Sequence, residues 1–139
     1  MKRAFNEYPE ISSKVIIING DKALLIKRRL LDPYAPKRWD IPGGGSDPGE
    51  DALQTAIREL EEEIGYQASI DHIVLHNKEK IIKPNRSYHR HTFIHKSNDK
   101  FEPKLSKEHS EFKWMDIKEI EGTNLPDHYK LVCREVLSA

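Results

Sequence analysis

Three glutamates, Glu59, Glu62 and Glu63, lie within five consecutive residues of a chain of 139. In a helix, at about 100° per residue, their side chains span only about 100° and form one acidic stripe. Most acidic runs are solvated surface. Here, however, like charges four residues apart destabilise a helix, and Arg58 is the only basic residue of the segment. Converging carboxylates, completed by waters and phosphate oxygens, suit Mg²⁺, so the stripe predicts a divalent-metal site.

A run of three glycines, Gly43 to Gly45, lies shortly before the acidic segment. Glycine lets the backbone approach a ligand closely and present its amides and carbonyls to it. A plain turn is the simpler interpretation of such a run, and the chain has no GxxxxGK[ST] phosphate-binding loop. The glycine run therefore indicates a ligand-binding loop only because it lies beside the carboxylates.

The segment Asp51–Ile64, which carries the acidic stripe, has the pattern of a helix. Asp51 and Gln54 have the spacing of a capping box at its start. Gly65 can end it in the left-handed conformation, with Tyr66 packing back on the last turn. The apolar residues form a second stripe beside the acidic one: Leu53, Ala56, Ile57, Leu60 and Ile64. We expect this apolar stripe to face the core and the glutamates to lie at the rim of a cleft.

Strands are predicted on both sides of this helix. A hairpin over Ser13–Arg28 is expected to turn at Asn19-Gly20, and Pro84–Arg86 is expected to form a later turn. The other predicted elements are strands over 39–41, 70–75, 88–95 and 112–115 and a closing helix over about 126–137. This order indicates an α/β or α+β domain.

Composition narrows the possibilities. Lys and Arg number 23 and so do Asp and Glu, so a nucleic-acid binder that relies on overall positive charge is disfavoured. The single cysteine, Cys133, excludes an internal disulfide framework and fits a reducing compartment. Met1–Lys14 has no apolar run that predicts a signal peptide, and no stretch of about 20 apolar residues predicts a membrane span. We expect one cytoplasmic domain over residues 1–139, without membrane contact.

The glycine loop and the helix together resemble the Nudix box, the signature of the Nudix (MutT-like) hydrolases. Seven fixed positions of that signature match, and they are Gly44, Glu50, Arg58, Glu59, Glu62, Glu63 and Gly65. Leu60 fits an apolar position of the box, whereas Tyr66 stands where an aliphatic residue is usual. The resemblance implies a mixed β-sheet sandwiched between α-helices. It also implies Mg²⁺- or Mn²⁺-dependent pyrophosphatase activity on a nucleoside diphosphate linked to another group.

The same resemblance implies roles for individual residues. The metal ligands would be Glu59, Glu62 and Glu63, with the carbonyl of Gly44 as an additional one. Glu59, Glu62 and Arg58 would be catalytic, with Arg58 holding a carboxylate for which Glu50 is the candidate.

The general base would be one of the helix glutamates or a carboxylate from outside the box. Glu108 and Glu111, near a later strand, are the outside candidates. We favour Glu108 because a mobile loop could bring it in with the substrate. Two exposed glutamates are the alternative.

Substrate contacts are less well defined by the sequence. Arg28 and Arg38 are candidates for phosphate binding and Trp39 for the pocket border. Solvent exposure is the more usual outcome for such basic residues, and a core position is at least as usual for Trp39. His89, His91 and His95 would share one face of a strand. No fixed third ligand accompanies them, so a substrate pocket or plain sheet surface is favoured over a zinc site.

The favoured function is hydrolysis of a nucleoside triphosphate, including deoxy forms, to the monophosphate and pyrophosphate. Alternative substrates are ADP-ribose, sugar nucleotides and dinucleoside polyphosphates, which share the box. A non-catalytic nucleotide-binding Nudix module is a further alternative, disfavoured because every acid of the box is kept. The expected partner is a small nucleotide, with no stable nucleic-acid complex, and the chain is expected to be a monomer or homodimer.

Overall fold

A computed structural model describes residues 9–137, so both ends of the expected 1–139 domain, including residues 1–8 of the N-terminal stretch, lie outside the described residues. The expected first hairpin is present as β1 (Ile11–Asn19) and β2 (Lys22–Arg28). Gly20, with φ +61°, lies in the two-residue loop. Each strand has a run of buried apolar residues rather than an alternating one. Such runs indicate that both faces of the sheet are covered.

The sheet is mixed. Its strand order is β3-β2-β1-β6-β5, with β4 paired to β1 and β7 paired to β2. Only the β1–β6 pair is parallel among these pairs. The remaining strands are β3 (Trp39–Asp40), β4 (Gly43–Gly45), β5 (Val74–Lys83), β6 (Arg86–Lys96) and β7 (His109–Met115).

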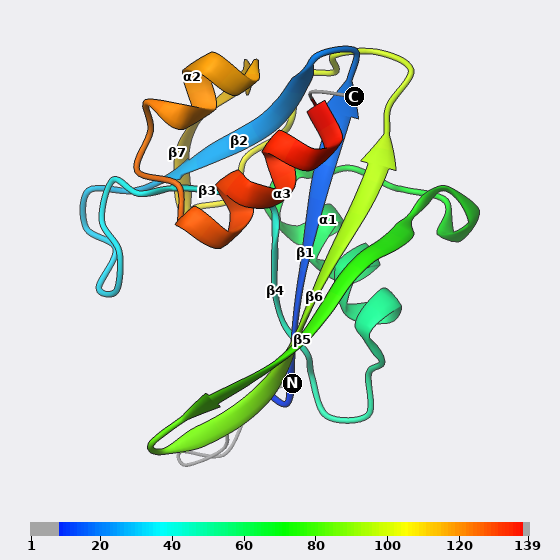
Figure 1. Cartoon of the computed structure of the whole chain (residues 1–139), viewed down its shortest axis with the longest axis vertical. Helices are drawn as coiled ribbons and strands as arrows, with labels where there is room; N and C mark the ends of the chain where they lie inside the picture. The colour runs from blue at the N-terminus through cyan, green and yellow to red at the C-terminus, as the bar shows by residue number, and fades with distance from the viewer. Residues whose placement is uncertain (1–8, 138–139) are drawn as a thin grey trace.

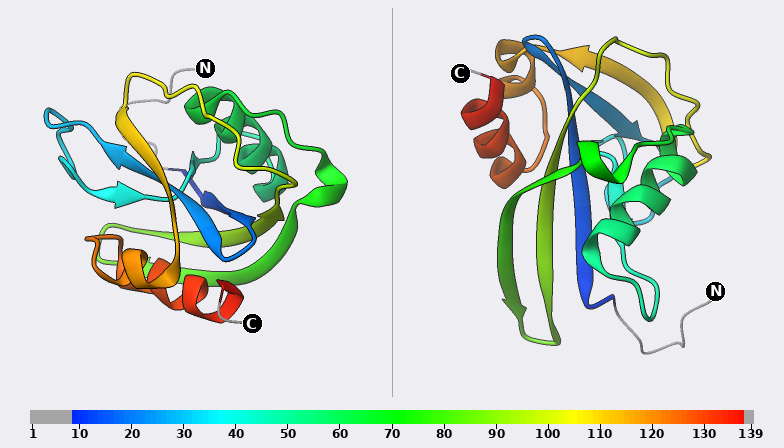
Figure 2. Two further views of the ribbon diagram at one scale, coloured as in Figure 1. Left: turned by 90° about the horizontal axis from the view of Figure 1, so that it is seen from above. Right: turned by 90° about the vertical axis from the view of Figure 1, so that its right-hand side faces the viewer.

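Helices cover the two faces of this sheet, as Figures 1 and 2 show. On one face α1 (Ala52–Ile64) packs its apolar stripe against alternate residues of β1 and β2. On the other face α3 (Asp127–Leu137) buries Tyr129, Val132 and Cys133 against the intervening residues. The expected sandwich of a mixed sheet between helices is therefore confirmed, in an α+β arrangement.

Helix α1 begins and ends where its sequence signals place it. The Asp51 side chain accepts a hydrogen bond from the Gln54 backbone, and the Gln54 side chain accepts one from the Asp51 backbone. Gly65 ends the helix with φ +65° and donates its backbone N–H to the Glu61 carbonyl. These local bonds satisfy groups that a helix end leaves open, which fixes the rotation at which the glutamates emerge.

One expectation about the later elements is wrong, and one element was missed. Residues 70–72 do not begin a strand but form a short 3₁₀ helix, η1 (Ile70–His72), and β5 starts only at Val74. Their strand propensity is overridden because the 3₁₀ turn carries Ile73 into the core under α1. The structure also has a short helix, α2 (Ile117–Glu121), that was not predicted.

The turn at Pro84 lies where it was expected, and the strands on either side of it are longer than predicted. The hairpin of β5 and β6 extends well away from the helices (Figure 1). Within residues 9–137, no helix combines the length and apolar character needed to cross a membrane.

Candidate active site

The three glutamates of the acidic stripe all reach one cavity, which Gly44 also lines. They are held to different degrees. The Glu63 side chain is buried and its Oε1 accepts the Gly43 N–H at 2.6 Å. The Glu59 side chain is 14% exposed and lies against Gly44, whereas the Glu62 side chain is 58% exposed. The stripe thus runs from the core face to the cavity rim, as the helix phase predicts.

The glycine run is a short strand, β4, paired to β1 and packed beside α1. Gly43 has φ +142°, and a Cβ there would lie 2.0 Å from the Ser13 carbonyl oxygen. At Gly44 a Cβ would lie 2.7 Å from the Glu59 carboxyl group. Glycine is needed at both positions, at Gly43 to fit the backbone and at Gly44 to leave room for a carboxylate.

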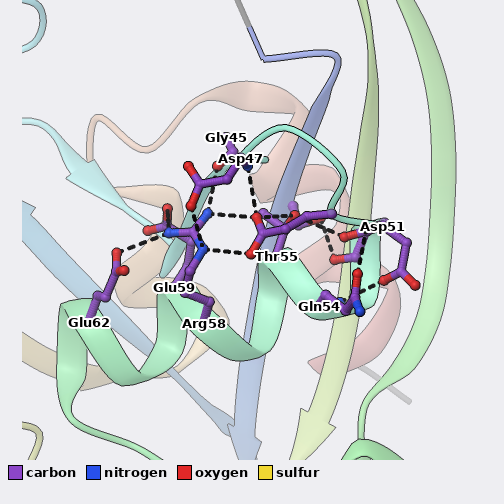
Figure 3. A network of polar contacts seen from close by, with 11 residues as sticks. Gly45, Asp47, Asp51, Gln54, Thr55, Arg58, Glu59 and Glu62 are labelled. Carbon is purple, nitrogen blue, oxygen red and sulfur yellow. Dashed lines mark hydrogen bonds and ion pairs between the residues drawn. The ribbon is translucent and has the colours of Figure 1, made fainter. Parts of the chain in front are cut away.

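Arg58 joins the loop to the acidic stripe (Figure 3). Its Nε and Nη2 donate to the two oxygens of Glu50 at 2.8 and 2.9 Å. Its Nη1 donates to Glu59 at 3.1 Å and to Glu62 at 3.0 Å, and Nη2 also donates to the Gly45 carbonyl. The expected pairing of Arg58 with Glu50 is present. The acidic stripe therefore has a cation of its own, because Arg58 contacts two of its three glutamates.

Electrostatics differ sharply between these acids. The Arg58 guanidinium, followed by the Asp47 amide and Thr55 hydroxyl, lowers the pKa of Glu50 to about 2. Burial raises the pKa of Glu63 to about 8, although Lys14 and the Gly43 amide oppose the rise. Burial also raises the pKa of Glu59. A cation bound beside Glu59 and Glu63 would favour the charged forms of both carboxylates.

Lys14 is a buried cation beside the stripe that the sequence analysis did not single out. Its Nζ donates to Asp40 Oδ2 and to the Gly43 carbonyl, both at 3.2 Å. Burial alone would lower the pKa of Lys14, but Asp40 and Glu63 together raise it above its ordinary value. The only local sequence signal is a charged residue directly before the apolar run of β1.

Glu108 reaches the same cavity from the loop before β7. One ligand atom each of Glu63, Glu108 and His109 lie within 4.8 Å of one another. The loop is tied to α1 because Ser106 N–H donates to the Glu63 carbonyl at 3.0 Å. Glu111 instead lies on β7, is 56% exposed and faces Lys27 at 3.9 Å. Of the two outside carboxylates, the structure brings only Glu108 to the acidic stripe.

The cavity has a volume of about 980 Å³ and has charges of both signs on its walls. Arg28 and Arg38 line it, as expected of phosphate contacts. Trp39 is not among the lining residues, because it packs against the core under α3 and its ring faces Lys27. Lys83 and Arg86, whose charges make the tip of the β5–β6 hairpin basic, also line it. Other lining residues escaped the sequence analysis because only the fold brings them here: Tyr34, Tyr88, Arg90, His128 and Tyr129.

The histidines of β6 do not come together as metal ligands. His95 is buried, with Nδ1 2.8 Å from the His72 carbonyl and Nε2 2.7 Å from the Tyr66 hydroxyl. His91 is also buried and stacks on Phe93. Among the described residues, the potential metal-binding cluster is that of Glu63, Glu108 and His109. His95 therefore anchors Tyr66, the residue that departs from the usual box, to the sheet.

Comparison with known proteins agrees with this geometry. The NUDIX domain matches residues 9–134, and the chain belongs to the Nudix family. An RNA pyrophosphohydrolase of Sphingopyxis alaskensis is 29% identical over 129 residues, 81% of this chain and 80% of that protein. A Bacillus subtilis relative, whose name includes the words 8-oxo-dGTP diphosphatase, is 43% identical over 56 residues. That match covers 40% of this chain and only 35% of the relative's length.

Solved structures share the fold. The dihydroneopterin triphosphate pyrophosphohydrolase of E. coli has a TM-score of 0.73 at 20% identity, over 94% of this chain and 97% of that one. The Ap4A hydrolase of C. elegans has a TM-score of 0.72 at 22% identity, over 90% and 93%. The chain is accordingly a Nudix hydrolase of the MutT-like kind, a pyrophosphohydrolase in a family that generally uses divalent metals.

Proposed function

We propose that this protein is a Mg²⁺-dependent hydrolase that cleaves nucleoside triphosphates to the monophosphate and pyrophosphate. One observation carries the proposal: a single cavity holds the acidic stripe, Gly44 and Glu108 together with six cationic side chains. The six are Lys14, Arg28, Arg38, Lys83, Arg86 and Arg90. Carboxylates suit a hard metal ion and cations suit phosphate oxygens, so the two sets complement one nucleotide polyphosphate.

The donor set supports a hard divalent ion. Glu59, Glu62 and Glu63 offer carboxylate oxygens, and Gly44, whose carbonyl is the further candidate ligand, lies against the Glu59 carboxyl group. Oxygen ligands of this kind favour Mg²⁺, and Mn²⁺ accepts them as well. When bound, the ion would neutralise the pyrophosphate charge and lower the pKa of the attacking water.

The chain's own residues would then orient the reaction. Arg58 positions Glu59 and Glu62 through its Nη1, while its other nitrogens fix it to Glu50. Glu108 would take the proton of the attacking water, since it reaches the cavity from a loop outside the acidic stripe. Lys14, fixed by Asp40 and Gly43, holds positive charge against the buried Glu63.

The substrate class rests on the cations and on the relatives. Three of the six cations already have acidic partners, namely Lys14, Arg28 and Arg90. A triphosphate still brings more charge and more oxygens to the cavity's cations than a diphosphate bridge does. Relatives named RNA pyrophosphohydrolase and a neighbour named for dihydroneopterin triphosphate are consistent with triphosphates. Because the chain has no net charge, we favour a free nucleotide over RNA.

A product analysis tests this proposal. The purified protein is incubated with Mg²⁺ and a panel of ribo- and deoxynucleoside triphosphates, ADP-ribose, a sugar nucleotide, a dinucleoside polyphosphate and a 5′-triphosphorylated RNA. We expect a triphosphate to give the monophosphate and pyrophosphate at the highest rate. Preferred cleavage of any other member replaces the proposed substrate, and no cleavage of any member returns the chain to the class of non-catalytic nucleotide-binding modules.

A further inference from the structure

Three arginines of the cavity share an unusual feature. Within residues 9–137, five buried side-chain polar atoms make no hydrogen bond, and three of them are the Nε atoms of Arg28, Arg38 and Arg90. All three residues line the cavity. Buried polar groups are ordinarily paired, and unpaired ones in a native fold point to a strained or ligand-binding place. The Nε atoms themselves are shielded from solvent, so a ligand in the cavity would meet these guanidinium groups through their Nη atoms.

The three arginines are not neutralised equally. Arg28 pairs with Asp32 at 2.9 Å and with Asp40 at 3.4 Å. Arg90 has one partner, Glu79, at 3.1 Å. For Arg38, no side-chain hydrogen bond or ion pair forms with any residue of the range 9–137. Of these three arginines, Arg38 therefore carries the least compensated charge, and Arg90 has a single acidic partner.

The backbone around Arg38 is held in place on both sides. Asn124, in the loop before α3, accepts the Trp39 N–H at 2.9 Å and donates to the Lys37 carbonyl at 3.4 Å. The Arg38 carbonyl accepts the Arg28 N–H at 2.9 Å. Lys37 itself adopts φ +59°, a left-handed conformation that costs energy for any residue with a Cβ. Such strain persists where surrounding contacts enforce it, and here it fixes the Arg38 backbone beside the cavity.

Arg38, Arg90 and His128 all line the cavity. Burial lowers the pKa of His128 and the two arginines lower it further, whereas Glu79 and Asp40 oppose them. At the acidic end the neighbouring cations are different, because Lys14 and Arg58 are the ones that act on Glu59 and Glu63. The carboxylates of α1 and the two arginines therefore line one cavity, and within residues 9–137 neither Arg38 nor Arg90 forms an ion pair with a carboxylate of α1.

We propose that Arg38 and Arg90 bind a third phosphate, beyond the two joined by the bond that is cleaved, and so select substrates with three consecutive phosphates. The planar fork of arginine suits a terminal phosphate, which offers several oxygens to two guanidinium groups. Asn124 is the positioning residue that holds Arg38. This inference rests on the proposed function for its substrate, but the subsite can be tested without catalysis.

Two measurements test it. Calorimetry compares the binding of inorganic triphosphate and of pyrophosphate to the wild type and to Arg38→Gln and Arg90→Gln, in the absence of divalent metal. Kinetics with Mg²⁺ compare kcat/KM for the triphosphate and the diphosphate of one nucleoside. Arg134→Gln is the matched control, since Arg134 pairs with Glu121 on the α3 surface, away from the cavity lining.

We expect the wild type to prefer the three-phosphate compound in both measurements. Each cavity variant should lose that preference by about tenfold or more, with the diphosphate values nearly unchanged, because a charged hydrogen bond to phosphate is lost. Arg134→Gln should keep the preference. Asn124→Ala should weaken it while leaving every charge in place, a result that a purely structural role would not give. If Arg38→Gln does not fold, Arg38→Lys, which keeps the charge without the fork, should still reduce the preference.

The inference is overturned if Arg38→Gln or Arg90→Gln keeps the wild-type preference, or if the wild type binds triphosphate no better than pyrophosphate. Failure of the proposed function looks different. In that case the wild type hydrolyses neither nucleotide. The calorimetric comparison of triphosphate with pyrophosphate then still shows whether Arg38 and Arg90 bind a third phosphate.

Discussion

Gly44 and Glu59 compete for one small space beside the acidic stripe. A Cβ at residue 44 would lie 2.7 Å from the Glu59 carboxyl group, which is the free end of a flexible side chain. We therefore expect Gly44→Ala to displace that carboxylate with little cost in folding, since a side-chain end moves more cheaply than backbone. Activity should fall by about tenfold or more while Tm stays near the wild-type value. Enzyme assays and thermal melts check both halves.

The neighbouring position supplies the matched comparison. At Gly43 a Cβ would meet the Ser13 carbonyl oxygen at 2.0 Å and the backbone φ is +142°, so the main chain itself must shift. Gly43→Ala should destabilise the fold by about 2 kcal/mol or more. Equal losses of Tm in the two variants would show that Gly44 is needed for folding rather than to make room for Glu59.

The Glu50–Arg58 pair makes stability depend on acid. The pKa of Glu50 falls from 4.5 to about 2 in the fold, chiefly because Arg58 donates to its carboxylate. A depressed folded pKa means that the contribution is complete above about 4.5 and is lost as pH falls towards 2. Glu50→Gln should lower the free energy of unfolding by about 1–3 kcal/mol at neutral pH. Urea unfolding at several pH values measures this free energy. Between pH 4.5 and 2, the free energy of unfolding should fall less in Glu50→Gln than in the wild type. Parallel wild-type and variant pH profiles would contradict this.

At the scale of elements, the loop before β7 and the strand itself offer one carboxylate each. Glu108 shares the cavity and the cluster with Glu63, whereas Glu111 faces solvent and Lys27. We expect Glu108→Gln to lower kcat by about tenfold or more with KM little changed, as for loss of a general base. Glu111→Gln should have a much smaller effect. Full activity in both variants would contradict this and indicate that a glutamate of α1 is the general base.

Local signals were enough to predict α1 and its acidic stripe. The capping box of Asp51, the left-handed Gly65 and the spacing of apolar residues act within a few residues of chain, and the structure keeps all three. The short helix α2 had the same kind of signal in Asp116 and Glu119, which form a capping box, so it could have been found. Strand propensity at residues 70–72 was misleading because burial of Ile73 decides the backbone there.

The cationic side of the cavity could not be predicted in the same way. Arg90 and Tyr88 come from β6 and His128 from α3, and only the sheet order and the layering bring them together. Lys14 is likewise recognisable only once Asp40 and Gly43 are seen beside it. Such contacts join residues far apart in sequence, about which periodicity carries no information.

At the scale of the whole molecule, net charge conceals how charge is distributed. The 23 basic and 23 acidic residues cancel, yet one cavity gathers both the carboxylates of α1 and six cationic side chains. A neutral surface with a polarised cavity favours a small ligand that carries both a metal ion and phosphates over a long polyanion. The sandwich makes this possible because α1 and α3 bring their side chains to the cavity from opposite faces of the sheet (Figure 2).

The most direct test of the whole account is the dependence of hydrolysis on Mg²⁺ in the wild type and in Glu62→Gln. Glu62 is exposed at the cavity rim, so this substitution should leave Tm within about 2 °C of the wild type. Initial rates on the best nucleotide triphosphate, measured while Mg²⁺ is raised from a chelated zero, should increase and saturate in the wild type. In Glu62→Gln they should stay lower by about a hundredfold or more. Wild-type rates that ignore Mg²⁺, or a variant with the same Mg²⁺ response as the wild type, would contradict the metal site on α1.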